Sequence, residues 1–233
     1  SLNIKHTGSF RDSSEFKKNN LLVLEKNNIK VGLLNYTYGT NGMPVPYPTV
    51  VNQIDTNSIR KDIQRSKQQN LDKLIVVMHW GPEYKSQPSN KQKKIASFLF
   101  REGADIIIGA HPHVLQKMES LENCGEKNSK VIAYSLGNYV SNQRARKKDG
   151  GAMIELLLTK KQDKTKISET GYHLTWVHKP IINSKEVFKI LPCKEYEKKN
   201  FIGLDEKSKN AMKLFISDSR KLFQNENINI TEK

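Results

Sequence analysis

The stretch Gly103-Ala104-Asp105-Ile106-Ile107-Ile108-Gly109-Ala110-His111-Pro112-His113-Val114-Leu115-Gln116 decides the fold of this chain. Residues 106–108 are a short apolar run near two glycines, which predicts a buried strand that leads directly into two histidines. In an extended segment alternate side chains point the same way, so we expect the imidazoles of His111 and His113 to lie side by side. Pro112 has a fixed φ and no N–H, which stiffens the pair and keeps it out of a sheet ladder. This arrangement would present two neutral imidazoles to a metal ion.

A second apolar run, residues 74–78, ends at His79. Between the two runs, Ser89-Asn90-Lys91-Gln92 is a capping box that predicts a helix ending near Gly103. Together these elements form a βαβ unit with parallel strands, whose carboxyl ends share the edge where ligands bind in open α/β sheets. We therefore expect His79, His111 and His113 to converge.

The same edge has two further candidate residues. The apolar run 131–136 ends at Asn138, which can offer an amide oxygen or N–H to a bound group. Glu83 follows His79 closely and is either an outer carboxylate that orients His79 or a surface charge. A single histidine after a strand, such as His79, is also common as a purely structural residue.

The chain is strongly basic, with 39 Lys and Arg against 24 Asp and Glu and a net charge of +15. Such an excess favours contact with polyanions, although scattered lysines also suit an ordinary solvated surface. The one dense cluster is Arg-Ala-Arg-Lys-Lys at residues 144–148. We expect no nucleic-acid partner, because the sequence has no aromatic and basic platform for stacking bases. Cys124 and Cys193 fit no metal or disulfide framework and leave the redox compartment open.

The length of 233 residues suits one large domain with an appendage. We expect a domain over residues 1–192 and a helical appendage over residues 193–233 that packs on it and frays from Gln224. No apolar run approaches the ~20 residues of a membrane span. The first residue is not Met, so we expect a fragment of a longer protein that carries an anchor or export signal elsewhere.

Other expected elements follow from periodicity and turn residues. The loop 37–48 contains five glycines and prolines and either lines a site or is a surface excursion. The expected elements are a hairpin over residues 21–36, a helix over 57–69, strands over 151–158 and 172–177 joined by a loop at 160–170, a short strand over 187–191, and a helix over 208–223.

Three motifs together resemble one known family: His-Trp-Gly-Pro-Glu-Tyr at residues 79–84, the stretch 103–116, and Tyr-Ser-Leu-Gly-Asn-Tyr at residues 134–139. They are similar to the capsule-synthesis family, often called CapA or PgsA after poly-γ-glutamate capsule synthesis, which is related to the calcineurin-like metallophosphoesterases. The resemblance covers roughly residues 5–158.

The resemblance implies an α/β fold, a metallophosphatase-like α/β/β/α sandwich lacking its N-terminal portion, with C-terminal strands and a helix. It also implies a two-metal site in which His79, His111 and His113 match the family's C-terminal metal ligands. The plausible ions are Zn²⁺, Mn²⁺ and Fe. Four residues are expected to contact the substrate or the metal ligands: Glu83, Trp80, Asn138 and Gln116.

The sequence departs from the family pattern in its N-terminal half. It has no Asn-His pair, the motif that supplies a metal ligand and the catalytic acid region in related phosphoesterases, and no opening Asp-bearing strand. Two-metal hydrolysis also needs a bridging carboxylate, with ions about 3.5–4 Å apart. We therefore expect half of the site here, an isolated chain with little or no activity, and the missing N-terminal half of the domain as its partner.

Two functions remain open on the sequence. One is a metal-dependent phosphoesterase-like domain that acts on or handles an anionic polymer at the cell surface, membrane-anchored in the full-length protein. The alternative is a non-catalytic scaffold subunit that binds polyglutamate or another anionic polymer in a capsule synthesis or export complex with other subunits. Exposed charge contacts weaken with salt far more than metal ligation does, which separates the two.

Overall fold

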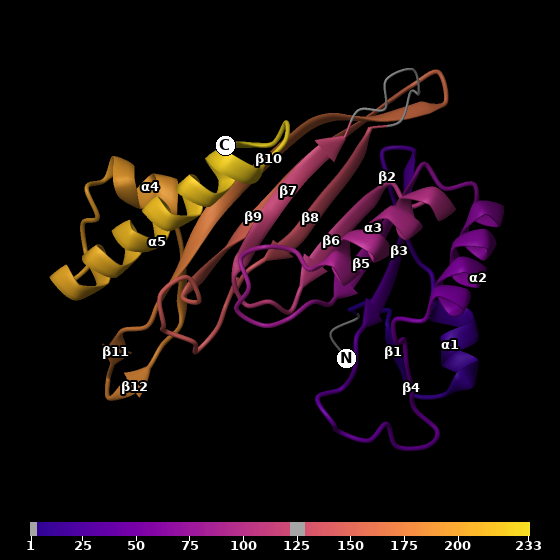
Figure 1. Ribbon diagram of the computed structural model, residues 1–233, viewed down its shortest axis with the longest axis horizontal. Coiled ribbons are helices and arrows are strands. Elements are labelled where there is room, and N and C mark those ends of the chain that lie inside the picture. The colour runs from indigo at the N-terminus through magenta and orange to yellow at the C-terminus, as the bar shows by residue number, and fades with distance from the viewer. Residues whose placement is uncertain (1–3, 122–128) are drawn as a thin grey trace.

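The computed structural model describes residues 4–121 and 129–233, which form two large sheets flanked by helices (Figure 1), together with two small sheets of two strands each. Cys124 lies outside the described residues. The six-stranded main sheet has the order β2-β3-β5-β6-β8-β7, and its central strands β3, β5, β6 and β8 are parallel. Its strands are β2 (Leu22–Lys26), β3 (Ile29–Thr37), β5 (Lys73–His79), β6 (Ile106–Ala110), β7 (Leu115–Leu121) and β8 (Lys130–Leu136).

Local sequence signals explain the first half of this sheet. The β2–β3 hairpin turns at Asn27 and Asn28, whose φ values of 51° and 60° suit a tight hairpin turn. Helices α2 (Thr56–Ser66) and α3 (Asn90–Glu102) lie on one face of the sheet and bury a core that includes Met78 and Leu99. The predicted capping box of α3 is present, and the helix ends at Gly103.

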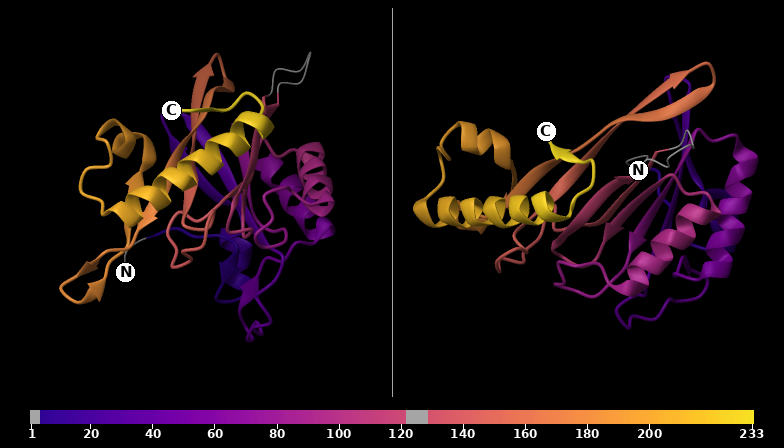
Figure 2. Two further views of the ribbon diagram at one scale, coloured as in Figure 1. Left: turned by 60° about the vertical axis from the view of Figure 1, so that its left-hand side comes forward. Right: turned by 45° about the horizontal axis from the view of Figure 1, so that its top comes forward.

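The second sheet lies on the other face of the main sheet (Figure 2). It contains β9 (Gly150–Lys161), β10 (Lys164–His178), β13 (Lys189–Pro192) and β14 (Thr231–Glu232). The core between the sheets joins Met118 of the main sheet, Trp176 of β10 and Phe215 of helix α5 (Glu206–Glu226). The α/β class, with C-terminal strands and a helix, is thus confirmed.

Several elements differ from the sequence-based expectation. The expected loop at residues 160–170 is a two-residue turn at Gln162 and Asp163, with φ values of 47° and 59°, and both strands continue to it. The tail after Gln224 continues α5 and then pairs with β10 through β14. The helix expected over residues 57–69 is present as α2 and a final 3₁₀ turn, η1 (Lys67–Gln69). Strand β7 and several short elements were not predicted; the latter are β1 (Ser9–Phe10), α1 (Ser13–Asn19), β4 (Val50–Val51), β11 (Ile181–Ile182), β12 (Lys185–Glu186) and α4 (Cys193–Lys198).

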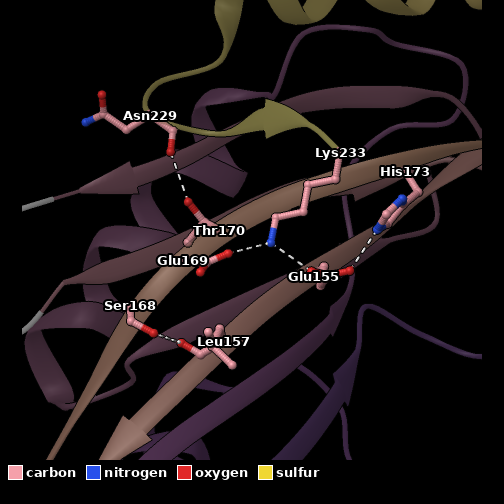
Figure 3. A network of polar contacts seen from close by, with 8 residues as sticks. All are labelled: Glu155, Leu157, Ser168, Glu169, Thr170, His173, Asn229 and Lys233. Atoms are coloured by element: carbon pink, nitrogen blue, oxygen red, sulfur yellow. Dashed lines mark hydrogen bonds and ion pairs between the residues drawn. The ribbon is translucent and has the colours of Figure 1, made fainter. Parts of the chain in front are cut away.

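The C-terminal residues are tied to the outer side of the second sheet (Figure 3). Lys233 Nζ lies 2.8 Å from Glu155 Oε1 and 2.9 Å from Glu169 Oε2, and His173 Nε2 lies 2.8 Å from Glu155 Oε2. Exposed ion pairs of this kind add little stability, so the pairing of β14 with β10 depends mainly on backbone hydrogen bonds and the core beneath. None of the helices within residues 4–121 and 129–233 is long and apolar enough for a membrane span.

Candidate metal centre

The carboxyl ends of four parallel strands bring the candidate residues to one edge of the main sheet. Tyr38 follows β3, His79 ends β5, His111 and His113 follow β6, and Asn138 follows β8. The ring centroids of His79 and His111 are 4.6 Å apart, those of His111 and His113 5.9 Å, and those of Tyr38 and His111 4.4 Å. The three histidines therefore form one cluster, as the βαβ argument predicts.

The backbone of the histidine pair differs from the expected extended strand. Strand β8 lies between β6 and β7, so residues 111–114 must cross the end of β8, about two strand spacings or roughly 10 Å. His111 has a φ of 98° and His113 a φ of 59°, conformations that non-glycine residues rarely adopt. The two rings do lie close together, but the expected cause, alternation of side chains along an extended strand, is wrong. A bent, strained crossing brings them together, and such strain is commonly found at functional sites.

Asn138 fixes the proton on the His113 ring. Its Nδ2 donates to Gln143 Oε1 at 3.1 Å and to the Lys148 carbonyl at 2.7 Å, so its Oδ1 is the atom that faces His113 Nδ1 at 2.9 Å. An oxygen acceptor there requires the hydrogen on Nδ1. The Nε2 lone pair of His113 is then free to bind a metal, the role that such outer partners have in metal sites.

Glu83 joins two of the histidines in a set of metal-capable atoms. One ligand atom from each of Glu83, His111 and His113 lies within 4.8 Å of the others, and Glu83 Oε1 is 4.0 Å from His113 Nε2. Two imidazoles and one carboxylate fit a single divalent transition ion. His79 stands outside this set, and Glu83 lies beside His113, whereas the sequence argument paired it with His79.

Burial favours the neutral form of two of the imidazoles, those of His79 and His111. It lowers the pKa of His79, and the neighbouring His111 and His113 lower it further. Burial also lowers the pKa of His111, where Glu83 acts in the opposite direction and His113 adds to the lowering. Neutral imidazole is the form that binds metal, so the environment favours the binding-competent state near neutral pH.

Three residues beside the cluster, Tyr84, Gln143 and Lys148, form a wall of the site that was not predicted. The Tyr84 ring lies 5.9 Å from the His113 ring, its hydroxyl accepts a 3.2 Å hydrogen bond from Gln143 Nε2, and the Lys148 Nζ is 3.9 Å above its centroid. The hydrogen bond to Glu83 raises the pKa of Tyr84, with burial as a second cause. Tyr84 belongs to the first motif, which could have indicated it; nothing in the sequence indicated Gln143.

Trp80 and Gln116 are placed away from the cluster. Trp80 is 1% exposed, and its Nε1 donates to the Tyr134 carbonyl at 3.0 Å. Gln116 is 0% exposed and binds the backbone of the loop after His79, through the carbonyls of Lys85 and Gln87. The structure does not bring either side chain into contact with the three histidines.

The fold and the site define an α/β domain with a candidate metal centre at the carboxyl ends of its parallel strands. Residues 1–143 match the family described as bacterial capsule synthesis protein PGA_cap, and the chain belongs to that family. It is 39% identical over 89 residues to "PGA biosynthesis protein CapA" of Bacillus subtilis (strain 168), and 38% identical over 89 residues to "Capsule biosynthesis protein CapA" of Bacillus anthracis. Each match covers 38% of this chain, and 22% and 20% of those proteins, so the chain matches about a fifth of their length. The capsule-synthesis resemblance is thereby confirmed.

Two solved structures show a more distant likeness. The calcineurin-like phosphoesterase YfkN from Bacillus subtilis aligns with a TM-score of 0.43 at 17% identity, over 92% of this chain and 62% of that one. The NAD nucleotidase NadN of Haemophilus influenzae aligns with a TM-score of 0.43 at 15% identity, over 92% of this chain and 45% of that one.

Proposed function

We propose that this chain is a metal-dependent phosphoesterase-like domain that acts on an anionic polymer at the cell surface in capsule or poly-γ-glutamate synthesis. The observation that carries the proposal is the held tautomer of His113. Its Nε2 lone pair is directed away from Asn138 and lies beside Glu83. A structural histidine needs no such arrangement, whereas a metal ligand does.

Different residues of the site would bind the metal ion and the anionic substrate. Glu83, His111 and His113 would hold one divalent ion, with Zn²⁺, Mn²⁺ and Fe²⁺ as candidates. When bound, such an ion supplies a Lewis acid and lowers the pKa of its water. The ammonium of Lys148, above the Tyr84 ring, offers a positive charge to an anionic substrate at the same wall.

His79 suggests a second position beside the first. It lies against His111 and Tyr38, but within residues 4–121 and 129–233 it belongs to no set of three metal-capable ligands. We propose that further ligands reach His79 from other parts of a longer protein, since the curated relatives are about five times longer than the matched segment. Those parts and other capsule synthesis subunits would be its partners.

The test combines metal analysis with a substrate screen. The full-length protein is loaded with Zn²⁺ or Mn²⁺ and assayed on phosphodiesters and phosphomonoesters, with His111→Ala as the site variant. His173→Ala is the matched control, because His173 lies on the second sheet, paired with Glu155. We expect metal retention and turnover in the wild type and the control, and loss of both in His111→Ala. Absence of metal and of turnover in the wild type would rule out the enzyme.

The basic loop favours the scaffold function as a second candidate. Residues 144–148 adjoin the site, and within that loop Arg144 and Lys148 have aromatic partners, Trp176 and Tyr84 respectively. Binding of labelled polyglutamate that survives His111→Ala and weakens steeply with salt would support the scaffold, because exposed charge contacts are screened and metal ligation is not.

A further inference from the structure

The loop that carries Glu83 has little structure of its own. It connects β5 to α3, contains no helix or strand, and exposes both Glu83 and Tyr84. An exposed glutamate on a free loop loses considerable conformational entropy when it is held at one place. Something outside the loop must therefore hold the Glu83 carboxylate beside His113.

One support comes from strand β7. The side chain of Gln116 is 0% exposed, and its Nε2 donates to the Lys85 carbonyl at 2.7 Å and to the Gln87 carbonyl at 3.3 Å. Its Oε1 accepts a 2.9 Å hydrogen bond from Gln92 Nε2. Gln116 thus connects the middle of the loop to helix α3.

The other support is Gln92 itself, on the first turn of α3. Its side chain is 1% exposed, and its Oε1 accepts from the Ser89 N–H at 2.9 Å and from the Ser89 hydroxyl at 3.1 Å. At the other end of the loop, a Cβ on Gly81 would lie 2.5 Å from the Gln92 amide, and Gly81 has a φ of 86°. Gln92 therefore packs closely beside Gly81 near the start of the loop and binds Ser89 at its end.

The two amides can adopt only one orientation. Because Gln116 Nε2 faces two carbonyls, its oxygen must face Gln92, and the oxygen of Gln92 must then face the Ser89 N–H. Flipping either amide would place buried donors against donors, which is costly away from water. A last tether, from the Tyr84 N–H to the Pro112 carbonyl at 2.7 Å, joins the loop to the histidine crossing.

We propose that Gln116 and Gln92 are positioning residues that set the metal affinity of the centre by holding Glu83 beside His111 and His113. This inference rests on the metal centre proposed above. It assigns Gln116 no contact with metal or substrate. Its effect passes entirely through the loop and the Glu83 carboxylate.

A double-mutant cycle on Zn²⁺ affinity, measured by calorimetry with Zn²⁺ alone, tests the proposal. Gln116→Leu is compared with the wild type and again in a Glu83→Gln background. We expect a loss of about 10- to 100-fold in the wild-type background and less than about threefold in the Glu83→Gln background, because the effect is transmitted through that carboxylate. The absorption spectrum of the Co²⁺-loaded protein should shift in the same direction in Gln116→Leu as in Glu83→Gln.

The matched control is Asn52→Leu. Asn52 is another buried amide, 8% exposed, whose Nδ2 donates to Asn20 Oδ1 and the Asn35 carbonyl away from the Glu83 loop. It should leave Zn²⁺ affinity unchanged. If Gln116→Leu does not fold, Gln92→Met interrupts the same chain of bonds from the helix side and takes its place.

The outcomes separate this inference from the proposed function. Zn²⁺ binding by the wild type, with equal losses for Gln116→Leu in both backgrounds or no loss in either, overturns the positioning role alone. Failure of the wild type to bind Zn²⁺ overturns both the positioning role and the metal centre. A loss confined to the background that retains Glu83 supports the proposal.

Discussion

Asn138 Oδ1 lies 2.9 Å from His113 Nδ1, while both amide hydrogens of Asn138 are engaged by Gln143 Oε1 and the Lys148 carbonyl. One buried side chain therefore sets the proton position on a candidate ligand and the path of the basic loop. These two effects can be separated by substitution, because the oxygen serves the histidine and the nitrogen serves the loop.

Asn138→Leu should lower Zn²⁺ affinity by about 10- to 100-fold, since His113 loses the partner that fixes its tautomer. Asn138→Asp keeps an acceptor for His113 and loses the donors to the loop, so it should retain most of the affinity. Calorimetric titration with Zn²⁺ checks both, with Asn142→Leu in the same loop as control. Equal losses in the two Asn138 variants would contradict the tautomer argument.

Glu83 and His79 should differ in their importance for the first ion. Glu83 belongs to the ligand set with His111 and His113, and His79 does not. We therefore expect Glu83→Gln and His111→Ala each to weaken Zn²⁺ binding by more than about 10-fold, and His79→Ala to change it by about threefold or less. Competition of each variant against a chromogenic chelator gives the affinities. A His79→Ala loss as large as that of His111→Ala would restore the three-histidine set.

Local signals in the sequence predicted much of the fold. The Asn27-Asn28 turn and the Ser89 cap are encoded within a few residues, and the convergence of His79 with His111 follows from the rule for parallel strands. The left-handed backbone of His111 depends on β7 pairing with β8 on the side of β8 that faces away from β6. No local sequence pattern indicates that β7 pairs with β8. The sequence therefore suggested an extended backbone for His111 and His113, which is incorrect.

The position of Glu83 could not be predicted for a similar reason. It depends on the hydrogen bond between Gln92 and Gln116, which are 24 residues apart in sequence. The capping box marks Gln92 as part of a helix start, but nothing in the sequence indicates its bond to Gln116. The C-terminal strand β14 likewise pairs with β10 only because α5 returns the chain to the second sheet. The positions of Glu83 and β14 are set by hydrogen bonds between segments distant in sequence, and such bonds cannot be predicted from hydrophobic periodicity.

Gly109 illustrates a close approach that tolerates no side chain. A Cβ there would collide with the Tyr134 carbonyl oxygen and lie 2.6 Å from Trp80 Nε1, the pair joined by a buried hydrogen bond. Gly109→Ala should therefore lower the free energy of unfolding by about 1–3 kcal/mol, as overpacking does. Urea unfolding measures the change.

Gly39→Ala is the matched control for this substitution. A Cβ at Gly39 meets nothing within 4 Å, so the variant should be neutral or up to about 1 kcal/mol more stable. If Gly109→Ala unfolds at the same urea concentration as Gly39→Ala, the neighbouring strand and Trp80 can relax and the close approach is not limiting.

Asp72 connects the main sheet to the second sheet, at the end of the main sheet far from the histidines. Its pKa makes the stability of this connection depend on pH. The carboxylate accepts from the Lys30 N–H at 2.7 Å and the Thr165 hydroxyl at 2.6 Å, and pairs with Lys160 Nζ at 3.0 Å. Burial raises the pKa of Asp72, but the bonds from Thr165, Lys30 and Lys160 outweigh it, so the pKa lies below its usual value. A depressed carboxyl pKa contributes stability that is complete above the unfolded pKa of about 3.9 and is lost as the pH falls through the folded pKa.

Asp72→Asn should accordingly lower the free energy of unfolding by about 2 kcal/mol at pH 7, because the amide cannot replace the charge-assisted acceptor. The gap between the variant and the wild type should narrow below about pH 4, because the unfolded wild-type chain then binds a proton at Asp72 more readily than the folded chain does. Urea unfolding at pH 7 and pH 3 measures both gaps. Asp163→Asn, an exposed carboxyl in the adjoining hairpin turn, is the control and should show no gap at either pH. If the difference in unfolding free energy between Asp72→Asn and the wild type stays constant down to pH 3, the connection between the sheets depends on the shape of the side chain and not on its charge.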